Sequence, residues 1–236
     1  MITVQIWSDY VCPFCYIGKR QLEQAIEQTG LSGNVNVQLR AFELDATTPK
    51  DANESTFETL SRKYGTSVEE AKNMTAGVAA RAAEVGLTYD FESMRTQNTR
   101  DTHRVMKFAE TKQLDGALGE RLMKAYFVEG QLIGQRDVLA TLAEEVGLVR
   151  SEVEAVIDNE AQFVEEVEND QLMAQQLQVR GVPFFVIDNK YGIAGAQPQQ
   201  LFNDTLQKAA AEAGIRPTLQ QVGDSGNVCG DDGCSI

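Results

Sequence analysis

The sequence is poor in basic residues and has no long apolar run. It contains 21 Lys and Arg against 35 Asp and Glu, which gives a net charge of −14 at pH 7. A surface of this sign repels a phosphate backbone, so we expect no nucleic-acid partner. No segment approaches the ~18 consecutive apolar residues of a membrane helix. No Lys or Arg precedes Lys19, whereas a secretory leader carries early positive charge. We therefore expect a cytoplasmic protein without a membrane partner.

Histidine and cysteine are also scarce. The chain has one histidine, His103, and four cysteines that form two distant pairs, Cys12 with Cys15 and Cys229 with Cys234. A closed zinc site needs four such ligands at suitable spacing. The two pairs differ in spacing, so zinc is the weaker alternative and we expect no metal; an inert buried pair is another alternative. In a reducing compartment, paired cysteines are more often catalytic or metal-binding than structural.

The hydrophobic pattern divides the chain into three parts. Apolar residues alternate with others along 2–7 and 35–42, which is typical of strands, and a helical pattern runs between them from Pro13 to Gly30. Such a β-α-β unit favours parallel strands joined by a right-handed crossover. Two strands and a closing helix are predicted near the other end of the chain, at 184–187, 191–194 and 199–213.

The middle part is helical in pattern throughout. Residues 67–70 and 151–154 each read Ser-x-x-Glu, which predicts a capping box at a helix start. Residues 160–178 predict one long helix. The apolar run at 184–187, which follows this block, predicts a strand that is covered on both faces.

The motif Cys12-Pro13-Phe14-Cys15 lies where the first strand meets the first helix. Free amide groups in the first helical turn give partial positive charge there, which favours a thiolate at Cys12. Cys15 lies one turn further on, within reach for a disulfide. Pro13 suits the first helical position, where no amide hydrogen is needed, and Pro13 and Phe14 are expected to tune the reduction potential. The motif predicts thiol–disulfide exchange through a mixed disulfide.

A second proline supports this interpretation. Pro183 precedes the predicted strand at 184–187, where a proline cannot donate to a sheet. In thioredoxin-like folds a cis-proline at this position faces the CxxC motif and exposes the backbone of the preceding residue, here Val182, to a substrate peptide. We predict a cis Val182–Pro183 bond; the alternative is a trans-proline at an ordinary strand start.

Four segments of the chain carry a resemblance to a known family, namely 8–18 (SDYVCPFCYIG), Asn98-Thr99 to His103-Arg104, 181–185 (GVPFF) and 195–197 (GAQ). In order and over nearly the whole chain, they resemble the FrnE-like branch of the DsbA family. The resemblance implies an α/β, DsbA-like thioredoxin-like fold with a large all-helical insertion, and dithiol–disulfide exchange on protein or peptide substrates as an oxidase or isomerase. Cys12 matches the attacking cysteine, Cys15 the resolving cysteine and Pro183 the cis-proline.

The predicted parts follow from this resemblance. The thioredoxin-like domain comprises residues 1–48 and 179–214, the helical insertion residues 49–178, and a C-terminal tail residues 215–236. FrnE-like proteins can carry a C-terminal cysteine pair, so Cys229 and Cys234 are candidates for a second redox pair; the alternative is that these two cysteines are incidental. No bound cofactor is expected, although glutathione is a candidate redox partner.

Two other functions are open. A related branch contains kappa-class glutathione transferases and 2-hydroxychromene-2-carboxylate isomerases, but these typically have serine where Cys12 stands. The second alternative function is a peptide-binding holdase that carries out no catalysis. His103 is expected to be structural or solvated, with a place in the active-site groove as the alternative.

Overall fold

A mixed four-stranded sheet forms the base of the molecule. The structure, a computed structural model, describes residues 1–216 together with the backbone of 229–230 and 233–234. The strand order is β2-β1-β3-β4, with β1 parallel to β2 and β3 antiparallel to both β1 and β4. The predicted β-α-β and β-β-α halves are therefore confirmed. The strands are β1 (Ile2–Ser8), β2 (Val35–Ala41), β3 (Phe184–Ile187) and β4 (Tyr191–Ala194).

Helices α1 (Pro13–Gln28) and α9 (Gln199–Glu212) cover one face of this sheet. The alternation along β1 places Ile2, Val4 and Ile6 on that face, where they are buried with residues of both helices. Gly30, which adopts φ 66°, follows the end of α1, a backbone conformation that glycine reaches without a steric penalty. The face therefore carries a closed apolar core that holds α1 against the sheet.

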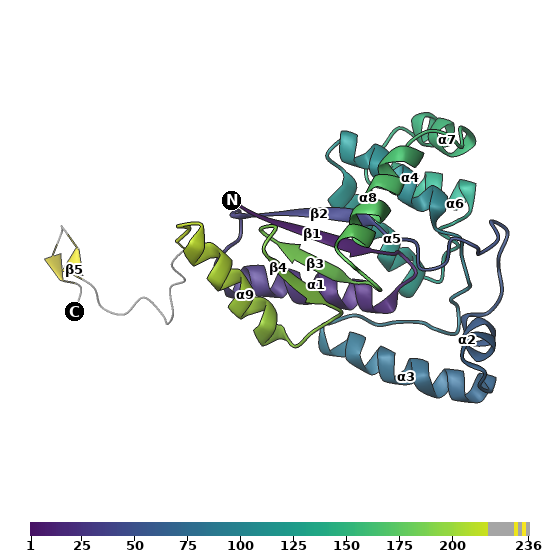
Figure 1. Ribbon diagram of the computed structural model, residues 1–236, viewed down its shortest axis with the longest axis horizontal. Helices are drawn as coiled ribbons and strands as arrows, with labels where there is room; N and C mark the ends of the chain where they lie inside the picture. The colour runs from purple at the N-terminus through teal and green to yellow at the C-terminus, as the bar shows by residue number, and fades with distance from the viewer. Residues whose placement is uncertain (217–228, 231–232, 235–236) are drawn as a thin grey trace.

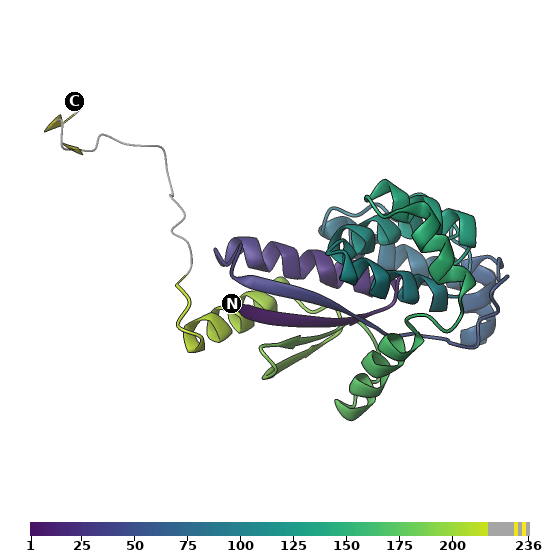
Figure 2. The same ribbon diagram turned by 90° about the horizontal axis from the view of Figure 1, so that it is seen from above.

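The opposite face is covered less completely. Helix α8 (Val164–Gln176) lies there, on the other side of the strands from α1 (Figure 2). The indole of Trp7 is fully buried, and its Nε1 donates to the Asp170 carbonyl at 2.8 Å. Along β3, however, Phe184 and Val186 on this face are only half-buried. The prediction that this strand is covered on both faces is therefore right for one face only.

The helical insertion gathers at one end of the sheet (Figure 1). A capping box at Ser67 is confirmed at the start of α3, but the predicted one at Ser151 is wrong, because the helix starts at Arg150 after Val149. The helix predicted at 160–178 is shorter, since α8 starts only after Phe163, which has φ 61°. Besides α8, the insertion helices are α2 (Thr56–Tyr64), α3 (Val68–Glu84), α4 (Arg100–Thr111), α5 (Asp115–Phe127), α6 (Arg136–Glu145) and α7 (Arg150–Asp158).

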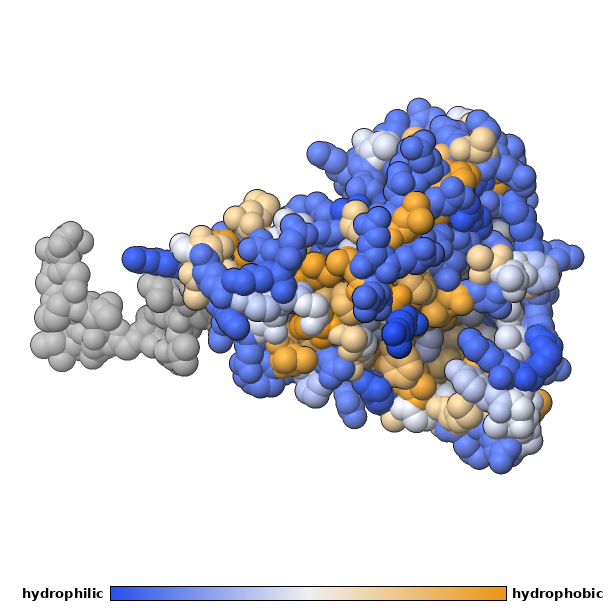
Figure 3. Space-filling model, viewed as in Figure 1, coloured by the Kyte–Doolittle hydropathy of each residue, from blue (hydrophilic) through white to orange (hydrophobic). Residues whose placement is uncertain are grey.

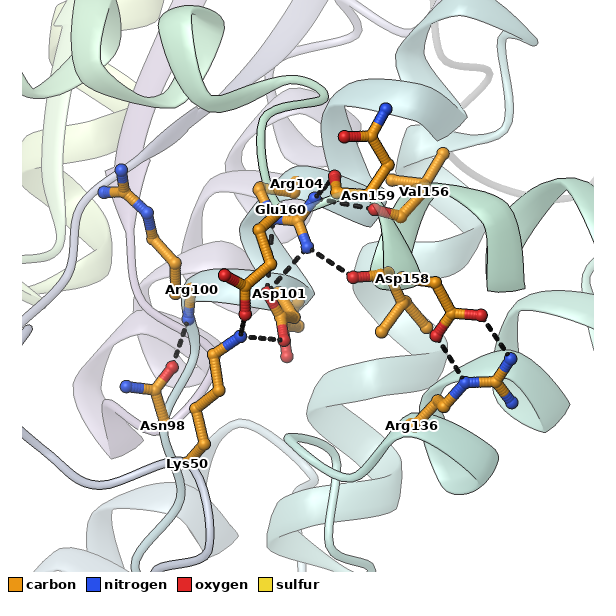
Figure 4. A network of polar contacts seen from close by, with 12 residues as sticks. Lys50, Asn98, Arg100, Asp101, Arg104, Arg136, Val156, Asp158, Asn159 and Glu160 are labelled. Atoms are coloured by element: carbon orange, nitrogen blue, oxygen red, sulfur yellow. Dashed lines mark hydrogen bonds and ion pairs between the residues drawn. The ribbon is translucent and has the colours of Figure 1, made fainter.

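A buried arginine of α4 holds the segment between α7 and α8 in place through hydrogen bonds to backbone carbonyls. The guanidinium of Arg104 is buried and donates to the carbonyl oxygens of Val156 at 2.6 Å and Asn159 at 2.9 Å. It also donates to the Asp101 carboxylate at 2.8 Å, as Figure 4 shows. These bonds satisfy carbonyls that the end of a helix leaves free. They explain why the chain turns at 159–163 before it enters α8.

The insertion and the sheet domain share a core at the redox motif. Cys12, Cys15, Tyr16 and Ile17 are buried in the same apolar cluster as side chains of α4 to α7. The first turn of α1 is therefore enclosed by residues of the insertion. Across the part of the chain that the structure describes, no helix is long and apolar enough to cross a membrane.

Candidate active site

Cys12 and Cys15 lie at the start of α1, as predicted. Cys12 is the N-cap residue in an extended conformation, and Pro13 is the first helical residue. The Cys15 amide donates to the Cys12 carbonyl at 3.0 Å, and the Cys12 amide donates to the Asp9 carbonyl at 3.1 Å. No acidic residue lies in the first turn of α1, so no side chain there opposes negative charge on Cys12. Both thiols are free and buried.

The Val182–Pro183 bond is cis, which confirms the sequence prediction. The Cys12 thiol donates to the Val182 carbonyl oxygen at 3.5 Å. Gly18 of α1 packs against this region: an added Cβ would lie 2.9 Å from the Phe185 ring and 3.1 Å from the Pro183 side chain. A glycine at this position therefore allows the active-site helix to approach the cis-proline closely.

Cys15 is the harder thiol to ionise. Burial raises its pKa well above the usual range, and the adjacent Cys12 sulfur raises it further, while the Ser8 hydroxyl and the Asp9 amide lower it in part. A buried thiolate without a cation beside it is costly, so Cys15 is held as a neutral thiol at neutral pH. It can attack a disulfide only after it loses its proton.

Two residues of the insertion reach the motif, and sequence analysis missed both. The hydroxyl of Tyr89 donates to the Pro13 carbonyl at 2.7 Å. Burial and then the charge of Cys12 raise the pKa of Tyr89, so this hydroxyl stays protonated and remains a donor. The guanidinium of Arg81 lies 5.0 Å from the centre of the Phe14 ring and donates to the Ala196 carbonyl at 3.0 Å. No motif or spacing marks either residue, because Arg81 of α3 and Tyr89 of the segment after it are both distant from the motif in sequence.

An open groove of about 430 Å³ runs beside the cis-proline. Val182, Pro183, Phe184 and Ala194 line it, and Arg180 stands exposed at its side. Apolar surface gathers on this face of the molecule over β3, β4 and α8 (Figure 3). Three apolar side chains of α8 and the turn after it are more than a third exposed, namely Leu172, Met173 and Leu177.

The remaining candidate residues are placed as follows. His103 is buried at the start of α4 and lies against Asp9, so it is neither solvated nor in the groove. Cys229 and Cys234 are Cα partners in a short antiparallel pair, β5 (Cys229–Gly230) and β6 (Gly233–Cys234). Their side chains lie outside what the structure describes, so a second redox pair stays a prediction. Within residues 1–216, no three or more His, Cys, Asp or Glu side chains are grouped to hold a metal ion.

Known proteins share this arrangement. A family model described as a DSBA-like thioredoxin domain matches residues 3–207. The crystal structure of a probable DsbA oxidoreductase from Streptomyces coelicolor is 35% identical, has a TM-score of 0.85, and is similar over 100% of this chain and 99% of its own. The uncharacterized protein YwbO of Bacillus subtilis (strain 168) is 26% identical over 87% of this chain and 96% of its own length.

A more distant structure shows the fold alone. The cytosolic disulfide reductase DsbM from Pseudomonas aeruginosa, solved with GSH, is 16% identical with a TM-score of 0.56, over 90% of this chain and 98% of its own. The family match and the Streptomyces structure agree with the observed fold over nearly the whole chain. The chain therefore belongs to the family of DSBA-like thioredoxin domains, the thiol–disulfide oxidoreductases related to DsbA.

Proposed function

We propose that the protein exchanges disulfides with peptide or protein substrates through Cys12 and Cys15. In the reducing direction, the Cys12 thiolate attacks a substrate disulfide, forms a mixed disulfide, and displaces the first substrate thiolate. Cys15 then attacks Cys12, forms the Cys12–Cys15 disulfide, and releases the second substrate sulfur as a thiolate. The oxidising direction reverses both steps. The observation that carries the proposal is the position of Cys12, at the amide-rich start of α1 and against the Val182 carbonyl.

The groove supports an extended peptide as the substrate. Val182 lies just outside the β3 ladder, which begins at Phe184, so its backbone can pair with a chain laid along the groove. The half-buried Phe184 lines the groove and offers an apolar contact there. Burial of such side chains contributes roughly 25 cal/mol for each Å² removed from water. A holdase would use the same surface, but it would leave the two thiols without a role.

An exchange assay tests the proposal. We expect the reduced protein to cleave the disulfides of insulin, and the oxidised protein to form disulfides in a reduced peptide with two cysteines. The control is the same protein with its thiols alkylated, which should lose both activities because the Cys12 thiolate is the nucleophile. If the alkylated protein is as active as the free one, or if neither protein turns over, the proposed function is wrong. An isomerase assay on 2-hydroxychromene-2-carboxylate tests the alternative.

We also propose glutathione as the partner that recycles the active site. Arg81 is exposed, makes no ion pair with a carboxylate in residues 1–216, and lies over Phe14 between the two cysteines. Glutathione carries one carboxylate on each of the two residues that flank its cysteine. A guanidinium at the motif without a carboxylate partner can therefore form an ion pair with it. The DsbM structure with GSH supports this choice of partner and a cytoplasmic site of action, because that reductase is cytosolic.

An Arg81→Gln variant should react more slowly with oxidised glutathione. We expect a loss of about twofold to fivefold in the rate constant, which corresponds to an exposed charge pair of roughly 0.5–1 kcal/mol. Reaction with an uncharged aliphatic disulfide should not change. Arg62→Gln is the matched control, because Arg62 is exposed and lies on α2, where it pairs with Glu54. Two outcomes would exclude Arg81 as a contact for glutathione. One is an equal loss of the rate constant in Arg81→Gln and Arg62→Gln, and the other is an equal loss with oxidised glutathione and with the uncharged disulfide.

A further inference from the structure

One arginine beside the cis-proline has no partner. Arg180 is exposed and lines the groove that runs along Pro183. Among the residues that the structure describes, none forms a hydrogen bond, an ion pair or a ring contact with its guanidinium. A guanidinium presents five N–H donors in a planar fork that matches the two oxygens of a carboxylate. The Arg180 side chain is therefore available to a molecule that enters the groove.

A guanidinium without a partner is an exception in this chain. The sequence has 35 acidic residues against 21 basic ones, and most arginines within residues 1–215 pair with a carboxylate of the described residues. Those that do not are Arg81, Arg95 and Arg180. Arg95 donates to nearby backbone carbonyls, and Arg81 donates to the Ala196 carbonyl. Arg180 alone of these three lacks even a carbonyl acceptor from the described residues.

Arg180 also gives the groove its charge. Of the described residues that line the groove, it is the only charged one, and the others are apolar or neutral. The Arg81 guanidinium adds positive charge nearby, because its acceptor Ala196 directly follows the groove residue Gly195. The net charge of the whole chain is −14. The groove is thus a local positive region on a protein that otherwise repels acidic molecules.

The backbone holds Arg180 close to the redox motif. Val179, just before it, is buried, and its amide donates to the Ala174 carbonyl at 2.9 Å. Two residues after Arg180, the Val182 carbonyl accepts from the Cys12 thiol at 3.5 Å. A chain advances by at most about 3.6 Å per residue, so the Cα atoms of residues 180 and 182 lie within about 7 Å of each other. A carboxylate a few residues from a substrate sulfur can therefore meet the guanidinium while that sulfur is at Cys12.

We propose that Arg180 makes the groove selective for peptide segments that carry a carboxylate side chain close to the reacting cysteine. The inference rests on the proposed function and names the class of substrate for the same site. The substrate carboxylate forms an ion pair with the guanidinium while the substrate backbone lies along the groove. Arg180 takes no part in the bond changes at sulfur, so it acts on the capture of the substrate. Because the protein as a whole is acidic, the position of the carboxylate in the peptide decides whether it is favoured.

Two peptide disulfides of equal net charge test this selectivity. Each is a symmetric dimer of a peptide with one cysteine and one glutamate. The glutamate is next to the cysteine in the near isomer and beyond a Gly-Ser spacer in the distal isomer. The protein is used in its reduced form and carries Cys229→Ser and Cys234→Ser, so that only the active-site thiols react. The measured quantity is the ratio of the second-order rate constants, near isomer over distal isomer.

We expect Arg180→Gln to lower this ratio about twofold to fivefold, which is the usual effect of one exposed ion pair. Arg180→Glu should lower the ratio further, because it places a like charge beside the glutamate of the near isomer. Salt at about 0.5 M should remove most of the difference between wild type and the variants, since it screens exposed charges. Effects of the glutamate on the peptide sulfur itself are the same for every variant, so they cancel when the ratios are compared.

Arg62→Gln is the matched control, because Arg62 is exposed on α2 and pairs with Glu54. It should keep the wild-type ratio. A wild-type ratio in both Arg180 variants would overturn the inference. A loss of rate confined to oxidised glutathione would overturn it as well, because Arg180 would then contact the recycling partner. If wild-type protein reacts with neither peptide, the proposed function itself is wrong.

Discussion

Cys15→Ser should trap the protein on its substrate. Cys12 keeps its place at the start of α1 and its contact with the Val182 carbonyl, so it should still attack a disulfide. The variant is made in a chain that also carries Cys229→Ser and Cys234→Ser, so no second thiol remains and the mixed disulfide can be released only by a thiol from solution. A well-placed intramolecular thiol acts at an effective concentration of many molar, so we expect resolution to slow by at least about 10³-fold. Non-reducing electrophoresis and intact mass would show a one-to-one covalent adduct.

Cys12→Ser in the same background is the matched control, since it removes one sulfur of the same buried pair. It should form no adduct and lose turnover, because Cys15 is enclosed and burial raises the pKa of its thiol. The difference between the two variants should persist in urea below the unfolding transition, and it should vanish once the chain unfolds. An adduct that forms equally fast in both variants would contradict the assignment of Cys12 as the attacking residue.

Local patterns predicted the elements that carry the two thiols. The alternation along residues 2–7, the helix that starts at Pro13 and the proline before residue 184 each depend on a few neighbouring residues, and all three are confirmed. The alternation in β1 predicted which of its side chains face the core under α1. A strand–helix junction positions a CxxC motif by backbone geometry alone, so the motif could be placed without tertiary information.

Interactions between distant segments could not be predicted in this way. The Tyr89 hydroxyl on the Pro13 carbonyl, the Arg81 guanidinium over Phe14 and the Asp9–His103 pair each join the insertion to the motif. Such contacts depend on how α3 and α4 pack. The shorter α8 has the same kind of cause: Arg104 of α4 donates to carbonyls at the end of α7 and to the Gln162 carbonyl, so contacts between distant segments hold the chain before α8.

The contacts that reach the motif depend on the position of α4, and Arg104 controls that position. Asp101, Thr102, His103 and Arg104 lie in the first turns of this helix. Arg104 donates to a carbonyl of α7, and His103 lies against Asp9. The two side chains therefore hold α4 against α7 and against the segment that follows β1. This scaffold also holds Asp9, whose carbonyl accepts from the Cys12 amide at 3.1 Å, next to the redox motif. The strength of this scaffold can be measured through Arg104.

Arg104→Met should be the most destabilising of these substitutions. It fills similar volume but removes every donor to the carbonyls of Val156, Ile157 and Asn159, and it leaves Asp101 without this partner. Removing one member of a buried charged network typically costs roughly 3–5 kcal/mol, a large share of the 5–15 kcal/mol by which domains are usually stable. The free energy of unfolding in urea measures the loss. Arg104→Lys should recover only part of it, because one ammonium group cannot reach all these acceptors.

Arg136→Met provides the comparison within the same part of the fold. Arg136 also bonds to α7, through both Asp158 carboxylate oxygens at 2.7 Å, but its side chain is 41% exposed (Figure 4). An exposed ion pair contributes about 0–1 kcal/mol, so this variant should unfold close to wild type. Equal losses in the free energy of unfolding for Arg104→Met and Arg136→Met would show that burial and the carbonyl contacts do not determine stability at the end of α7. A large loss confined to Arg104, with slower Cys15 resolution in the folded variant, would instead tie the packing of α4 to the chemistry at the redox motif.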